Sequence, residues 1–153
     1  MDGTYILSDL EQITGANRYL IQEWARQGLL EPTERTKGAG RGVHRRFNKA
    51  EVELAALLAA LSGHCSLGSL RVFAKKYKAR ATQQKFELTE TRQLIDAART
   101  GDEQVYLAFT VEDADRGSID VFRWNEKCSG PPGRVEKAKR TLLVNLARTW
   151  SQL

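Results

Sequence analysis

Cysteine and histidine are scarce in this 153-residue chain, which contains only two of each. The two cysteines, Cys65 and Cys128, lie far apart and do not make a disulfide framework. A zinc site needs about four ligands, usually in close pairs, whereas the cysteines and histidines here are scattered. The sequence therefore predicts incidental thiols, no metal site and a protein of the reducing cytoplasm.

Long apolar runs are also missing. The longest apolar stretch, residues 52–61, is interrupted by Glu53 and is too short to span a bilayer. The first residues, MDGTYILSDLEQ, lack the basic and then apolar order of a secretory signal. No Ser-His-Asp, Cys-His or phosphate-cradling pattern stands out. We therefore expect neither an enzyme nor a membrane protein, and no cofactor.

One stretch contains no acidic residue. Residues 35–49 carry six Lys or Arg and no Asp or Glu. The net charge of the whole chain is +5, and it is unevenly spread. Residues 1–86 contain 14 basic and 8 acidic residues, a net charge of +6, and residues 87–153 contain 10 and 11, a net charge of −1. This asymmetry favours a polyanionic partner for the N-terminal half.

Residues 14–32, TGANRYLIQEWARQGLLEP, predict a tight turn followed by one short amphipathic helix. Its apolar stripe consists of Leu20, Ile21 and Trp24. The turn, the N-cap, the left-handed C-cap and the final stop are marked by Gly15, Asn17, Gly28 and Pro32. Because Trp24 shares the apolar stripe, we expect it in the core. The other face is polar and basic.

A second helix is predicted just before this one. Ser8 followed by Glu11 has the capping-box pattern, which favours a short helix over residues 9–13. Two helices joined by a short glycine-containing turn form a helix-turn-helix arrangement.

Residues 33–47 follow, and we call them the wing. Three glycines exclude a regular helix there, and residues 33–36 and 43–47 are expected to pair as two short strands around the glycine-rich tip. A positively charged hairpin tip suits phosphates or a minor groove.

Two further helices are predicted after the wing. Asn48 caps the first, with Glu51 as its box partner, and the apolar residues that follow make this helix the buried spine of the domain. Ser66 caps the second. Residues 75–85, KKYKARATQQK, have little to bury and are interpreted as a frayed helix end or linker.

The second half changes character. Residues 89–99 predict a short helix, residues 104–111 and 119–124 a β-hairpin, and residues 135–150 a final amphipathic helix of about four turns. The predicted fold is thus mainly α with small β: a winged helix-turn-helix followed by a helix, a β-hairpin and a helix. We expect a DNA-binding domain at residues 1–76, a basic linker at 77–88, and a domain for oligomerisation or effector binding at 89–153.

The order of these elements over residues 4–76 resembles the winged helix-turn-helix domain of MerR-family transcription regulators. The resemblance is carried by Thr14-Gly15, Gly28-Leu29-Leu30 with Pro32, Arg45-Arg46-Phe47, and Ser66-Leu67 with Leu70. It implies a sequence-specific regulator that binds double-stranded DNA as a homodimer. The implied contacts are the helix residues Asn17, Arg18, Tyr19, Gln22 and Arg26, and the wing residues Lys37, Arg41, His44, Arg45 and Arg46.

Two features depart from that family. Its recognition helix usually carries a run such as Arg-Thr-Leu-Arg-Tyr-Tyr, where this chain has residues 19–24, YLIQEW. The long antiparallel helix that usually pairs two subunits has no counterpart, because no sustained heptads follow Lys76. Two alternatives therefore stay open: an excisionase-like recombination factor, and a module in which the winged domain docks a protein or the C-terminal half binds a small molecule.

Overall fold

The computed structural model describes residues 3–34, 36, 44–82, 88–113, 116–124 and 140–153. The chain forms two compact units, Met1–Ala60 with Gln152–Leu153, and Leu61–Ser151. The described residues are mostly helical with small sheets, as the sequence predicted. None of the helices in these ranges is long and apolar enough to cross a membrane.

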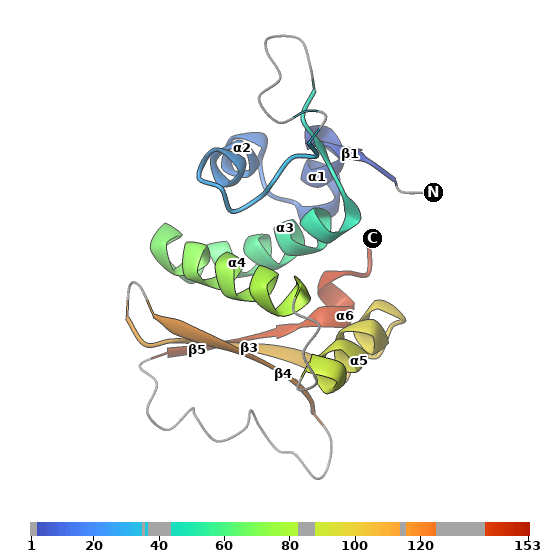
Figure 1. Ribbon diagram of the computed structural model, residues 1–153, viewed down its shortest axis with the longest axis vertical. Helices are drawn as coiled ribbons and strands as arrows, with labels where there is room; N and C mark the ends of the chain where they lie inside the picture. The colour runs from blue at the N-terminus through green and yellow to red at the C-terminus, as the bar shows by residue number, and fades with distance from the viewer. Residues whose placement is uncertain (1–2, 35, 37–43, 83–87, 114–115, 125–139) are drawn as a thin grey trace. The chain divides into compact units, whose positions relative to one another are not determined.

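A helix-turn-helix pair lies near the start of the first unit (Figure 1). Its helices are α1 (Leu7–Thr14) and α2 (Arg18–Arg26). They are joined through Gly15, whose φ of 69° lies in the left-handed region that favours glycine. The Asn17 side chain accepts the backbone N–H of Leu20 at 2.9 Å and so caps α2. The predicted turn and cap are confirmed.

The chain stops helix α2 as the sequence predicted. Gly28 has a φ of 78°, which allows the backbone to turn back. The N–H groups of Leu29 and Leu30 then donate to the Trp24 carbonyl at 2.9 and 3.3 Å. Both leucines are buried, together with Ile21 and Trp24 of α2. The expectation that Trp24 belongs to the core is confirmed.

Helix α1 begins earlier than the capping-box pattern predicted. Its N-cap is Ile6, and the Asp9 carboxylate accepts the Ile6 N–H at 2.8 Å. The expected cap at Ser8 is therefore wrong, since Ser8 lies within the helix. Asp9 fulfils the acidic half of a capping box, and the isoleucine side chain has no acceptor to supply the other half.

The strand partner at the base of the wing is also corrected. Strand β2 (Arg46–Phe47) pairs in antiparallel fashion with β1 (Tyr5–Ile6), whereas residues 33, 34 and 36 form no strand. Thr33 and Thr36 are each joined to Arg46 by a single hydrogen bond. Thr33 and Thr36 form a turn instead, in which the Thr36 N–H donates to the Thr33 carbonyl at 2.9 Å. A two-residue strand is too short to show a periodic pattern in the sequence. The tip of the predicted hairpin, residues 37–43, lies outside the described residues.

Helix α3 (Lys49–Ser62) is the apolar helix predicted after the wing. Asn48 caps it by accepting the Glu51 N–H at 2.9 Å. The Glu51 carboxylate also accepts the Glu31 N–H at 2.8 Å, a tertiary contact that the box pattern did not predict. Every residue of α3 from Val52 to Leu58 is buried, which confirms the helix as a buried spine.

The second unit contains α4 (Leu67–Thr82), α5 (Leu88–Arg99) and a three-stranded antiparallel sheet (Figure 1). The strand order is β4-β3-β5, with β3 at Val105–Val111, β4 at Gly117–Arg123 and β5 at Arg140–Asn145. Ser66 accepts the Ser69 N–H at 3.2 Å and caps α4 as expected. The helix continues to Thr82, further than the basic sequence suggested. The α4 residue Phe73 lies edge-on to Phe109 of β3, with ring centroids 5.2 Å apart, so α4 covers one face of the sheet.

The predicted β-hairpin is confirmed: β3 (Val105–Val111) pairs with β4 (Gly117–Arg123). The final helix predicted over residues 135–150 is wrong. Arg140–Asn145 form a third strand, β5, and of the described residues 140–150 only Leu146–Thr149 are helical, as α6. Residues 135–139 of the predicted helix lie outside the described residues.

The helix prediction failed because residues 140–145 pair with the edge of β3 that β4 leaves open. Apolar residues four apart are typical of a helix, yet β3 offers a row of backbone donors and acceptors that β5 satisfies. Leu142 pairs opposite Phe109, and Val144 opposite Leu107. Strand preference depends strongly on such context, which local spacing does not reveal.

Candidate nucleic-acid interface

Helix α2 has one face of exposed polar side chains and an opposite face that is buried. Ile21 and Trp24 are fully buried, whereas Gln22 is exposed and the side chains of Arg26 and Tyr19 keep most of their surface in solvent. Glutamine can contact adenine through two hydrogen bonds and arginine can contact guanine in the same way. The helix therefore offers the side-chain chemistry needed to read base edges.

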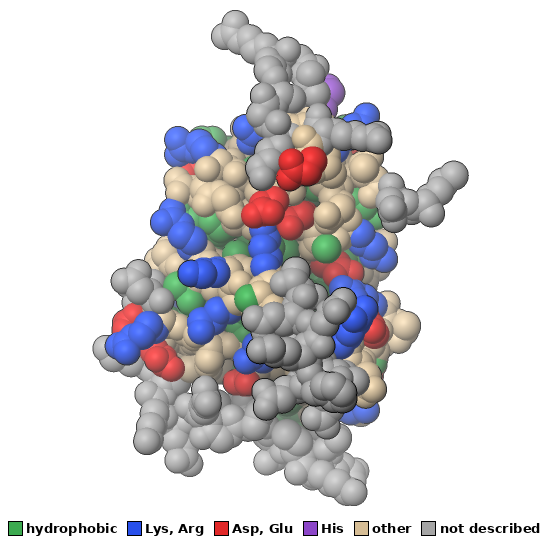
Figure 2. Space-filling view, viewed as in Figure 1, with side chains coloured by type: hydrophobic (Ala, Val, Ile, Leu, Met, Phe, Trp, Pro, Cys, Tyr) green, Lys and Arg blue, Asp and Glu red, His purple; other side chains and the backbone are tan. Residues whose placement is uncertain are grey.

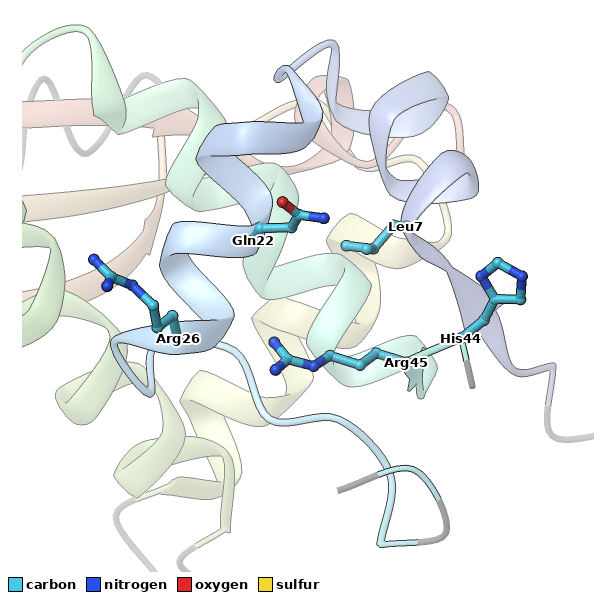
Figure 3. A pocket seen from close by; sticks show the side chains of 5 residues that line it. All are labelled: Leu7, Gln22, Arg26, His44 and Arg45. Atoms are coloured by element: carbon cyan, nitrogen blue, oxygen red, sulfur yellow. The ribbon is translucent and has the colours of Figure 1, made fainter. Parts of the chain in front are cut away.

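A hollow of about 380 Å³ lies between this helix and the base of the wing. It is lined by Leu7, Gln22, Arg26, His44 and Arg45. Figure 3 shows that these residues come from three segments: the start of α1, the exposed face of α2, and the chain just before β2. In that view the Arg45 side chain extends from the wing toward α2, and Gln22 points toward Leu7. Two predicted groups of contacts thus share one concave surface.

Three hydrogen bonds of Arg46 hold the base of the wing, residues 44–47, in place. Thr33 N–H donates to the Arg46 carbonyl at 2.8 Å, and Arg46 N–H donates to Thr36 Oγ1 at 3.0 Å. The Arg46 guanidinium donates to Thr4 Oγ1 at 3.1 Å. Arg45 is exposed and pairs with no acidic residue in the described part of the chain. Its charge is therefore available to a phosphate.

The arginines of α2 differ from Arg45 in this respect. Arg18 Nε lies 3.2 Å from Glu11 Oε2 of α1, in a solvent-exposed ion pair. Such exposed pairs contribute little to stability and exchange readily for other partners. Arg26 is held more firmly, because its Nε and Nη2 donate to the two carboxylate oxygens of Glu23 at 2.9 and 2.8 Å.

The Glu23 carboxylate has a third donor. Gln27 Nε2 donates to Glu23 Oε1 at 2.8 Å. The hydrogen bonds from Arg26 and then Gln27 lower the pKa of Glu23, and the bond to Glu23 raises the pKa of Arg26. A lowered pKa means that the carboxylate stays ionised at neutral pH, and the pair is lost only as the pH falls through that lowered pKa.

Asn17 has a structural task in addition to the predicted DNA contact, since its side-chain oxygen caps α2. We expect Asn17→Ala to lower the free energy of unfolding by about 1 kcal/mol, the usual cost of a lost N-cap. Asn17→Asp keeps an acceptor and should restore the stability in urea unfolding followed by circular dichroism. If Asn17→Asp is as stable as the wild type yet binds DNA with altered base preference, the amide group also contacts DNA.

The structure brings together four of the predicted contact residues, Gln22, Arg26, His44 and Arg45, around the hollow. Asn17, Arg18 and Tyr19 lie at the N-terminal end of the same helix, and Arg46 lies in β2. Lys37 and Arg41 lie outside the described residues.

Sequence reasoning missed two residues of this surface. Leu7 lines the hollow because α1 begins earlier than expected. Glu23 holds Arg26, and its signal was visible in the sequence as an acid and an arginine three residues apart on one helix.

Cys65 fits the expectation of an incidental thiol. It is half-buried, and its Sγ donates to the Leu61 carbonyl at 3.3 Å. Burial raises the pKa of the thiol, and the charge of Arg140 offsets part of this effect. A raised pKa leaves little nucleophilic thiolate at neutral pH. Cys128 lies outside the described residues.

The basic sequence between residues 75 and 85 is placed largely on α4. Lys75, Lys76 and Arg80 are exposed on this helix, which contains no acidic residue. Lys and Arg side chains gather over α4 in the space-filling view (Figure 2). They belong to the second unit and take no part in the hollow.

One family model matches part of this chain. The sequence model of the family described as "MerR HTH family regulatory protein" matches residues 5–64. The matched range runs from β1 into the residues after α3, and it contains all the residues that line the hollow. No curated protein is similar enough in sequence to this chain to count as a match.

Proposed function

Residues 5–64 form a MerR HTH family domain, which implies a DNA-binding transcription regulator, and we propose that this domain binds DNA in the following way. Helix α2 enters the major groove and its exposed face contacts base edges. The wing contacts the phosphates beside that site. Binding is therefore sequence-specific, with α2 supplying the preference and the wing supplying much of the affinity.

The observation that carries this proposal is the shared hollow. Gln22 and Arg26 of α2 line it together with His44 and Arg45 of the wing base. Groups suited to base edges and groups suited to phosphates thus lie side by side on one exposed surface. In the sequence, His44 and Arg45 belong to the acid-free stretch over residues 35–49, which carries six Lys or Arg.

We further propose that the protein acts as a dimer through residues 61–151. One helix-turn-helix reads a single half-site, and two-fold symmetry pairs two such half-sites one helical turn of DNA apart. The second unit has its own sheet and buried core and can provide the contact between subunits. It is also the place for a protein or small-molecule effector.

Arg45→Ala tests whether the wing supplies affinity for any sequence while α2 supplies the sequence preference. We expect weaker binding to every duplex, and a plot of log affinity against log salt that is shallower by about one, because one phosphate contact is lost. Gln22→Ala is the contrast: it should relax the preference at one base pair by about 1–3 kcal/mol and leave the salt dependence unchanged. Fluorescence anisotropy with a selected duplex and a scrambled duplex at several salt concentrations measures both quantities.

Two results would point to other functions. Equal affinity for the selected and scrambled duplexes, together with DNA bending, would favour an excisionase-like architectural factor. Absence of binding to any duplex at physiological salt would indicate that the winged domain docks a protein instead.

A further inference from the structure

The acidic residue on the recognition helix needs an explanation, because a carboxylate on a DNA-reading surface repels phosphates. Glu23 lies on α2 between two proposed contact residues, Gln22 and Arg26. Its side chain is 20% exposed, whereas that of Arg26 is 70% exposed. The acid is therefore tucked against the helix while the guanidinium it holds reaches solvent.

The contact between the two side chains has a defined geometry. Glu23 accepts one hydrogen bond from Arg26 Nε and one from Nη2, at 2.9 and 2.8 Å. Arginine has five N–H donors in a planar fork, so this pairing occupies the side of the fork. Among the described residues, nothing accepts from its terminal edge. That edge carries two parallel N–H groups, one on each terminal nitrogen. Guanine offers O6 and N7 in the major groove at the matching spacing.

The acid is itself held in place. Gln27 Nε2 donates to Glu23 Oε1 at 2.8 Å, from one turn further along the helix. An unrestrained arginine samples many rotamers and reaches phosphates as readily as bases. An arginine held on one side by a fixed carboxylate has lost part of this freedom before DNA arrives, and part of its net attraction to phosphates is cancelled.

Building on the proposed function, we propose that Glu23 is a positioning residue that aims Arg26 at a guanine in the target sequence. Glu23 does not contact DNA. It orients the Arg26 fork for two hydrogen bonds to one base and weakens its sequence-independent attraction to the backbone. Glu23 thereby lowers the affinity for DNA of any sequence and raises the preference for the target sequence.

The test begins with duplexes selected from a random pool by the wild-type chain. A set of variant duplexes is then made, in each of which one G·C pair of the half-site is replaced. Fluorescence anisotropy measures the affinity for the selected duplex and for each variant duplex at several salt concentrations. Wild type, Glu23→Ala, Arg26→Ala and the double variant form a double-mutant cycle. Circular dichroism at each step checks that the helix content is unchanged.

Glu23→Ala should lower the preference for one G·C pair by about tenfold, the usual scale of a two-bond arginine–guanine contact. It should also bind non-specific DNA more tightly, with a salt slope steeper by about 0.9, because Arg26 becomes free to contact a phosphate. In the Arg26→Ala background the same substitution should leave the base preference unchanged. Arg26→Lys keeps the charge without the planar fork and should lose the preference while keeping the salt dependence.

The matched control is Asp96→Ala. It breaks an exposed pair of the same spacing, Asp96 with Arg99 at 2.7 Å on α5, and makes the same change in net charge. It should alter neither the G·C preference nor the ratio of specific to non-specific affinity.

The outcomes separate the two claims. If the wild type selects a sequence but Glu23→Ala keeps its G·C preference, the positioning role is wrong and the proposed function stands. An equal loss of preference with and without Arg26 would also overturn it, because Glu23 would then act on its own. If the wild type selects no sequence, the proposed specific recognition fails, and the positioning role fails with it.

Discussion

Trp24→Ala is expected to remove about 3–5 kcal/mol from the free energy of unfolding, the usual range for deleting a buried aromatic side chain. Trp24 is completely buried, and its backbone carbonyl accepts hydrogen bonds from the N–H groups of Leu29 and Leu30, where the chain turns back after α2. Most small domains have a total stability of only about 5–15 kcal/mol. The loss is therefore a large fraction of the total stability and should move the unfolding midpoint to a much lower urea concentration. Urea unfolding followed by circular dichroism measures the change.

Two control substitutions sharpen this expectation. The Trp24 indole N–H is buried and has no acceptor among the described residues, so Trp24→Phe removes an unsatisfied donor while keeping most of the volume. It should cost less than about 1.5 kcal/mol. Tyr19→Ala, on the exposed side of the same helix, should stay within about 0.5 kcal/mol of the wild type. A similar loss for Tyr19→Ala and Trp24→Ala would contradict the assignment of the buried face.

Phe109→Ala is the second substitution for which we expect a large effect, again about 3–5 kcal/mol. Phe109 lies on the central strand β3, is 1% exposed, and packs edge-on against Phe73 of α4. Its loss removes buried area and an aromatic pair that contributes about 0.5–1.5 kcal/mol of its own. Urea unfolding with near-ultraviolet circular dichroism reports the packing of this unit.

Leu143→Ala on β5 is the matched control, because Leu143 is 43% exposed. It should change the stability by at most about 0.5 kcal/mol. If both variants lose the same stability, then α4 does not cover the β3 face through Phe109. A dimer contact on that strand would instead make Leu143→Ala shift the concentration dependence of unfolding.

Substitutions in the core and substitutions on the exposed face of α2 should affect stability and DNA binding differently. Gln22, Glu23 and Arg45 are not in the core, so their substitution should leave stability nearly unchanged while altering DNA binding. Trp24 should act in the opposite sense, since it is buried and supports the helix that we propose contacts DNA. A loss of binding therefore has a clear meaning only when it is measured beside the unfolding curve.

Much of the first unit was predictable from the sequence because its signals are local. Gly15 and Gly28 stand where the backbone has a positive φ, and Asn17 and Asn48 stand where helices need a side-chain acceptor. Ser66 does the same for α4 of the second unit. Caps and turns depend on residues within four positions of one another. The contact between Glu23 and Arg26 is local in the same way, because the two residues are three positions apart on one helix.

The helix α2 was predicted with its turn, cap, buried stripe and stop, because each of these follows from neighbouring residues. The tertiary structure alone decided that β2 forms its ladder with β1, and that residues 140–145 form a strand and not a helix. It also decided that Gln22 and Arg26 share a hollow with His44 and Arg45, some 20 positions further along the chain. Strand pairing and concave surfaces join residues that are distant in sequence, and their free energy depends on partners that no local pattern contains.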